Sequence, residues 1–274
     1  MTKWWIRLLA ACLLLSTQAM AGSVLELMTT EYTQDPPILG TVEISTLGSA
    51  SRIEITSISS NESGGMIYDG DKRELIAIDH DVQQYYVIDQ AMMDQMAAQV
   101  RDAMQQMRQA LEAMPPEQRA LAEQMMQRQI PPAEAPELPE FSLQKTGESD
   151  SVGGFDCEYY DVVQGGRKVR DLCMTEWSDF EEGRDIAAAI MQLADFFESM
   201  RQAFAGAGGL DLMGRQQELF AYMEELGGYP VLSRDYDTEG HLQLESRLKS
   251  AGHVEINPAI MFKPPNGYQQ GALQ

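Results

Sequence analysis

Residues 65–89 read GMIYDGDKRELIAIDHDVQQYYVID, and residues 92–114 read MMDQMAAQVRDAMQQMRQALEAM. The first stretch consists of short strand-like pieces separated by turn-forming triplets at 69–71 and 79–81. In the second stretch apolar residues recur every three or four positions, as on one face of an α-helix. The chain therefore changes from strands to helix near residue 90. The predicted apolar helix face consists of Met93, Met96, Val100, Met104, Met107, Leu111 and Met114.

More strands are predicted upstream of this boundary. Residues 24–32, 38–45 and 51–58 alternate in part between apolar and polar side chains and contain β-branched residues. Together with residues 65–89 they predict a meander of about six antiparallel strands.

Downstream of the boundary, prolines divide the chain. Pro115-Pro116 is expected to end the first helix, because proline cannot continue a helix but suits the first position of the next one. A second helical piece extends the helical insertion to residues 92–129. Residues 131–140, PPAEAPELPE, form a proline-rich linker that we expect to be extended.

Strands resume at residues 140–148, and a second helical segment follows at 178–227. Within that segment, apolar residues from Ile186 to Phe204 repeat at helical spacing. The remaining predicted strands are 229–236, 241–248 and 253–256. Because strands and helices are grouped and do not alternate, the order predicts an α+β fold with helices on one face of an antiparallel sheet.

The N-terminus has the anatomy of a secretory signal peptide. A basic n-region (Lys3 and Arg7) precedes the apolar run 8–15 and an A-x-A cleavage site at 19–21. Residues 1–21 are therefore predicted to be cleaved, leaving one domain at 22–274 that is exported in soluble form to the periplasm. The alternative is a lipoprotein anchored through Cys12, which lies in the box Leu9-Ala10-Ala11-Cys12.

The charge balance limits the possible partners. A formal net charge of −22 at pH 7 repels nucleic-acid phosphates and anionic lipid headgroups, so no nucleic-acid partner is expected. After the signal, no segment is long and apolar enough to predict a transmembrane helix.

Cys157 and Cys173 flank a strand-turn-strand segment centred on Gly165-Gly166. Folding at the glycine pair brings the cysteines nearly opposite each other, and an oxidising compartment allows them to pair. We expect a disulfide between adjacent strands. A metal site is not expected, because neither cysteine belongs to a CxxC pair and no histidine lies nearby in the sequence.

No catalytic motif is visible in the sequence, and we expect neither an enzyme nor a cofactor. His80 lies between Asp79 and Asp81, which is more typical of a turn than of a catalytic triad. Three interpretations of the Met-rich helix remain open: a seam packed against the sheet, an adaptable hydrophobic lid, or a copper(I) site. The first two are favoured over copper, since no histidine or cysteine joins the methionines.

Several segments resemble a bacterial family known as domain of unknown function number 4412. They are MIYDGDKRELIAIDHDVQQYYVID, MPPEQRALAEQMM, GGFDCEYYDV, GYPV and FKPPNGY. Such proteins look like relatives of the periplasmic lipoprotein carriers and lipoprotein-sorting proteins, the LolA-like superfamily. The resemblance implies a strongly curved antiparallel half-barrel, covered on its concave side by helices, in which the concavity can hold acyl chains.

Two functions follow as hypotheses. The first is a protein that binds an apolar or acyl-bearing ligand, such as a lipid or lipoprotein, through the Met-lined helix face. The alternative is a protein–protein interaction or structural module without a small-molecule ligand. Copper binding is a distant third hypothesis.

Overall fold

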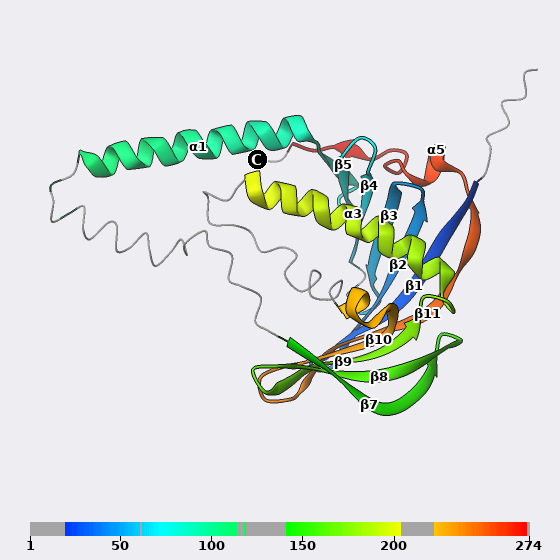
Figure 1. Ribbon diagram of the computed structural model, residues 1–274. Coiled ribbons are helices and arrows are strands. Elements are labelled where there is room, and N and C mark those ends of the chain that lie inside the picture. The colour runs from blue at the N-terminus through cyan, green and yellow to red at the C-terminus, as the bar shows by residue number, and fades with distance from the viewer. Residues whose placement is uncertain are drawn as a thin grey trace, which may run out of the picture.

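The computed structural model describes residues 20–60, 62–113, 115, 118, 141–203 and 222–272. It is an α+β structure with one open, curved sheet of twelve strands, shown in Figure 1. The strand order is β12-β6-β5-β4-β3-β2-β1-β11-β10-β9-β8-β7. The strands are β1 (Met20–Glu31), β2 (Ile38–Leu47), β3 (Ala50–Ser57), β4 (Ser63–Asp69), β5 (Glu74–Asp79), β6 (Gln84–Ile88), β7 (Phe141–Val152), β8 (Phe155–Gln164), β9 (Arg167–Glu176), β10 (Gly228–Tyr236), β11 (Leu242–Ile256) and β12 (Gln269–Gln270).

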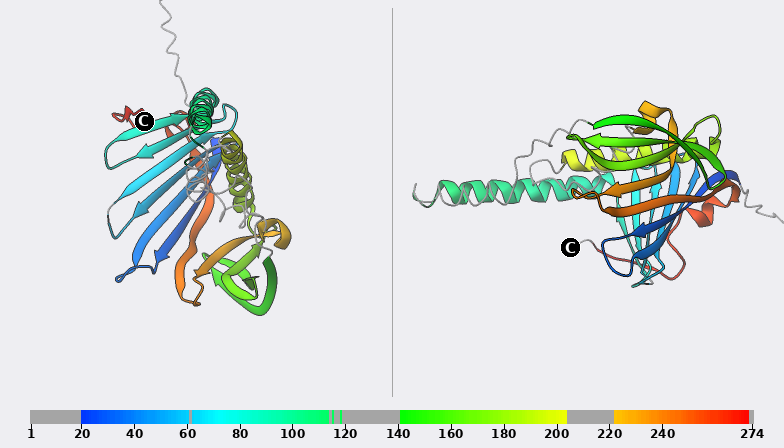
Figure 2. Two further views of the ribbon diagram at one scale, coloured as in Figure 1. Left: turned by 90° about the vertical axis from the view of Figure 1, so that its left-hand side faces the viewer. Right: turned by 90° about the horizontal axis from the view of Figure 1, so that it is seen from below.

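The sheet has two sequence-ordered halves joined at its centre. Strands β1 to β6 form the predicted meander, and β7 to β11 form the second half. The halves meet where β1 pairs with β11, antiparallel, from Met20↔Ile256 to Glu31↔Leu244. Every pairing is antiparallel except that of β12 with β6, which is parallel. Figure 2 shows the second half curling round toward the side that carries the helices.

One strand boundary was predicted wrongly. Residues 241–248 and 253–256 are parts of a single strand, β11, of 15 residues. Residues 249–252 were not predicted as strand, but pairing with β1 continues through them as Glu26↔Ser250, Leu25↔Ala251 and Val24↔Gly252. The ladder is interrupted only by a register shift between Glu26 and Leu27, so tertiary pairing overrides the local sequence signal.

Helix α3 (Glu181–Ala203) packs across β1, β2, β3 and β11 on one face of the sheet. Its buried side recurs at helical spacing, as the sequence predicts, with Ile186 and Leu193 almost completely inaccessible to solvent. A helical turn at 222–226 covers the second half of the sheet, where Tyr222 and Met223 join the main core cluster.

Helix α1 (Gln90–Glu112) begins at an N-cap: the Asp89 carboxylate accepts a hydrogen bond from the Met92 backbone N–H. Its first two turns are anchored, because Met93 and Ala97 are buried. Met93 packs with Tyr68 of β4 and Phe196 of α3. Beyond these turns, Figure 1 shows α1 running past the sheet. The helix was predicted correctly. The second helical piece and the linker 131–140 lie outside the described residues, apart from Gln118.

Residues 257–272, called here the C-terminal strap, run over the other face of β4–β6. They include the short helix α5 (Pro258–Met261) and strand β12. Phe262 and Tyr268 pack on the buried side chains of Ile67, Ile76 and Ile78. In the part of the chain that the structure describes, no helix has the length and hydrophobicity needed to cross a bilayer.

Candidate functional site

The predicted disulfide is present. Cys157 on β8 and Cys173 on β9 are joined with an S–S distance of 2.10 Å and a Cα–Cα distance of 5.3 Å. The residue opposite Cys173 is Tyr159, two positions from Cys157, so the bond is diagonal across the two strands. The register shift between Val162 and Val163 adds one residue to this offset, since the pairing of Gln164 with Arg167 would otherwise place Glu158 opposite Cys173. Both cysteines are buried in the main core cluster.

The predicted Met-lined face is only partly in contact with the body of the protein. Met93 is buried, whereas Met96 is 39% exposed. Met107 and Leu111 are half-buried. The side chains of Val100 and Met104, and the whole of Met114, lie outside the described residues. None of the predicted lid residues lines either of the two pockets described next.

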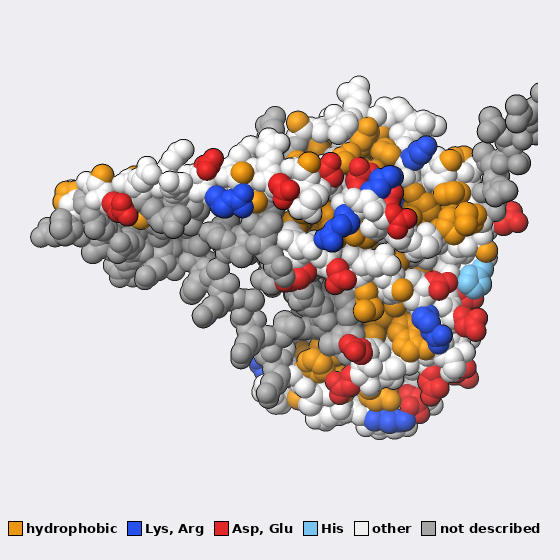
Figure 3. Space-filling model, turned by 45° about the horizontal axis from the view of Figure 1, so that its top comes forward, with side chains coloured by type: hydrophobic (Ala, Val, Ile, Leu, Met, Phe, Trp, Pro, Cys, Tyr) orange, Lys and Arg blue, Asp and Glu red, His pale blue; other side chains and the backbone are white. Residues whose placement is uncertain are grey.

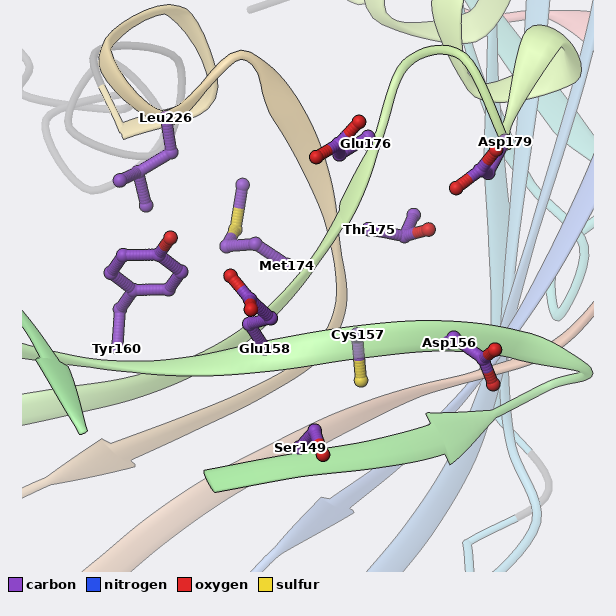
Figure 4. Close-up of a pocket in the computed structure, with 10 residues that line it drawn as sticks. All are labelled: Ser149, Asp156, Cys157, Glu158, Tyr160, Met174, Thr175, Glu176, Asp179 and Leu226. Carbon is purple, nitrogen blue, oxygen red and sulfur yellow. The ribbon is translucent and has the colours of Figure 1, made fainter. Parts of the chain in front are cut away.

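The first pocket, shown in Figure 4, has a volume of about 270 Å³ and lies across β7, β8 and β9. Its floor is one cross-strand row, in which Ser149 is opposite Glu158 and Glu158 is opposite Met174. Leu226, from the helical turn 222–226, borders it. We call it the acidic pocket, lined by Ser149, Asp156, Cys157, Glu158, Tyr160, Met174, Thr175, Glu176, Asp179 and Leu226.

The acidic pocket contains four carboxylates and few groups that neutralise them. Lys145 forms an ion pair with Glu158 and donates a hydrogen bond to its carboxylate. This hydrogen bond raises the pKa of Lys145. The Ser178 hydroxyl donates to Glu176 Oε2 at 3.3 Å. Within the described residues, no basic side chain pairs with Asp156, Glu176 or Asp179. Among those residues, no group of three or more His, Cys, Asp or Glu side chains could hold a metal ion.

The second pocket, of about 450 Å³, lies between the β8–β9 turn and the β10–β11 turn. At its wall Lys168 pairs with Asp161 and Asp171, and the Tyr236 hydroxyl donates to Asp171 Oδ2 at 2.6 Å. Burial, followed by the hydrogen bond to Asp171, raises the pKa of Tyr236 to about 12. Lys168, the two aspartates and Tyr236 thus form one connected group, which is typical of a structural ion-pair network.

His80 belongs to a network that the sequence did not predict. Its Nδ1 lies 2.8 Å from the Tyr268 hydroxyl oxygen, and its Nε2 lies 2.7 Å from Glu54 Oε2. Arg52 pairs with Glu54 and donates from Nη1 to the carbonyl oxygen of Met261 at 2.8 Å. The network ties the C-terminal strap to β3 and the β5–β6 turn. The predicted turn chemistry is also present, since Asp79 Oδ1 accepts from the backbone N–H groups of the two residues after His80.

No protein-family model and no curated protein sequence matches the chain. Among solved structures, an uncharacterized conserved protein from Thermus thermophilus is 7% identical, with a TM-score of 0.43, covering 93% of this chain and 91% of that one. A chain of the Pseudomonas aeruginosa MucA/MucB complex is 9% identical, with a TM-score of 0.35, covering 86% of this chain. The crystal structure of MucB is 8% identical, with a TM-score of 0.33. This chain spans about half the length of those two chains, 53% and 54%.

Proposed function

We propose that the chain is an exported, non-enzymatic interaction module of the cell envelope that binds a protein partner along α1. The signal-like N-terminus supports export. The Cys157–Cys173 disulfide also supports export, because such bonds persist in oxidising compartments.

The single observation that carries the proposal is the placement of α1. This helix has 23 residues, but Met93 and Ala97 of its first two turns are its only fully buried side chains among those described. Figure 3 shows apolar side chains of α1 on the surface among acidic and basic ones. Methionine recurs on surfaces that repack against varied apolar partners, since its side chain is unbranched and polarisable. A helix held at one end and bearing methionines suits insertion of its apolar face into a partner's groove.

Site-specific photo-crosslinking in intact cells tests this proposal. A photoreactive residue replaces Met107 on α1, and the matched control replaces Lys72 in the β4–β5 turn. We expect a discrete protein adduct from the Met107 position and none from the control. Adducts of the same kind from both positions, or only lipid adducts from position 107, would contradict a protein partner on α1.

An apolar ligand is the second candidate, favoured by an uncovered apolar side chain on the helix-bearing face of β3. Ile53 of β3 packs in the core, and Ile55, two residues on and so on the same face, is 48% exposed. Its cross-strand neighbour on β2 is Val42, which is half-buried. An acyl chain lying over these residues would cover them.

Binding of a fluorescent fatty acid distinguishes an apolar ligand from a protein partner. Ile55→Asp should weaken binding about tenfold or more, because a charge would enter the apolar surface. Thr56→Asp is the matched control, since Thr56 is also exposed but points to the opposite face. Equal binding by both variants and the wild type would exclude this surface as the acyl site.

A further inference from the structure

The two edges of the sheet differ in how their backbone hydrogen-bonding groups are paired. At one edge, β6 pairs with β12: Gln269 N–H donates to the Gln83 carbonyl at 3.0 Å, and Gly271 N–H donates to the Tyr85 carbonyl at 2.9 Å. At the other edge, β7 has β8 as its sheet neighbour and no strand beyond it among the described residues. An edge strand exposes backbone donors and acceptors that can pair with another extended chain.

The part of β7 next to its hairpin presents these groups outward. Ser151 N–H donates at 2.8 Å to the Asp150 carboxylate and not to β8, so the backbone groups of Ser151 face away from β8. Because backbone groups in an antiparallel pair alternate between the two sides, those of Ser149 face outward as well. Residues 144–151 are all exposed.

Ser149 also lies at the β7 end of the row that forms the floor of the acidic pocket (Figure 4). A strand added outside β7 would lie about 4.8 Å away, with a side chain beside Ser149 on the pocket face. The short Ser149 side chain leaves a path over β7 toward Glu158, Glu176 and Asp156. A long side chain is needed to cover this distance. The volume of about 270 Å³ lies below the roughly 300–1,000 Å³ of pockets for whole drug-sized ligands, and so suits one side chain.

The charges decide which side chain fits. Four carboxylates line the pocket, and Lys145 is the one basic side chain paired with any of them among the described residues. Figure 3 shows acidic side chains spread over the visible surface and fewer basic ones, and the whole chain carries −22. A second copy of this chain would therefore be repelled, and a basic segment attracted.

We propose that the free edge of β7 binds an extended, basic segment of a partner protein by strand addition, with a lysine or arginine of that segment in the acidic pocket. Main-chain hydrogen bonds to the backbone of Ser149 and to the carbonyl of Ser151 supply affinity, since the Ser151 N–H is already bonded to Asp150. The pocket supplies specificity for the long cation. This surface is separate from α1, so it adds a second contact to the proposed interaction module. The two proposed contacts can be tested independently of each other.

The test uses the full mature chain and a short peptide of alternating lysine and threonine, with binding followed by fluorescence anisotropy. We expect the peptide to bind the wild-type protein, and the double variant Glu158→Gln/Glu176→Gln to bind about tenfold more weakly, as for loss of a charge-assisted hydrogen bond. Glu62→Gln is the matched control, because this exposed carboxylate lies in the β3–β4 turn. It should bind like the wild type.

Two further measurements separate strand addition from simple charge attraction. Ser149→Pro removes an outward N–H without removing a bond to β8, and prolines are tolerated on edge strands, so it should abolish binding while the fold survives. An N-methylated form of the peptide, which cannot pair with an edge, should fail to bind the wild-type protein. Equal binding by the N-methylated peptide, or by the double variant, would overturn the proposal. Loss of the crosslink from α1 would leave these results unchanged.

Discussion

Cys157 and Cys173 connect two strands that are already neighbours through their backbone hydrogen bonds. The bond therefore acts mainly on the unfolded chain, where it closes a loop with a sequence separation of 16. We expect the double variant Cys157→Ser/Cys173→Ser to lower the free energy of unfolding by about 3 kcal/mol, as measured by urea denaturation. An unchanged urea midpoint would mean that the unfolded chain is not constrained by the bond.

Single residues also show which features of the structure can be predicted from the sequence and which cannot. The disulfide could be predicted because Gly165-Gly166 sets the hairpin and the cysteines flank it almost evenly. The His80 network could not, because Glu54 and Tyr268 are far from His80 in the sequence and no motif connects the three. The carboxylates of the acidic pocket were missed for a related reason. They lie on β8, at the end of β9 and just after it, and only strand pairing brings them together.

At the scale of elements, the exposure of the methionine side chains changes sharply between neighbouring turns of α1. Met93 is 1% exposed and Met96 is 39% exposed. We expect Met93→Asp to destabilise the protein by more than about 2 kcal/mol, because a charge would enter the cluster formed with Tyr68 and Phe196. Met96→Asp should change stability by no more than about 0.5 kcal/mol. Thermal unfolding of the two variants side by side measures this, and equal losses would show that α1 is packed along more of its length.

The elements themselves were largely predictable, and their contacts were not. The strands of the meander and the long helices follow from local hydrophobic period. Both helices have apolar residues at helical spacing, but they are buried to different extents. On α3 the buried residues extend from Ile186 to Phe196, whereas on α1 they are Met93 and Ala97 among the described side chains. The difference depends on where each helix begins relative to the sheet. Period indicates which face of a helix is apolar, and it does not state what covers that face.

At the scale of the whole molecule, the C-terminal strap protects one edge of the sheet. Removing residues 257–274 should expose Ile67, Ile76 and Ile78 together with the open edge of β6. We expect the truncated protein to self-associate despite its negative charge, because an exposed apolar edge strand accepts another strand. Analytical ultracentrifugation measures this, with removal of residues 272–274 as the control that keeps β12. A monomeric long truncation would show that the strap has no protective role.

The pairing of β1 with β11 determines when the sheet can be completed during synthesis of the chain. Residues 20–31 are synthesised well before their partners at 244–256, with which they pair at the centre of the sheet. Until β11 is synthesised, β1 has one unpaired side, and the loop that must close runs from β1 to β11. Chains with such distant pairings fold slowly and expose strand edges while they wait. A ribosome stalled before residue 242 would therefore hold a nascent chain in which β1 lacks its partner β11. That chain would need protection from aggregation until β11 is synthesised.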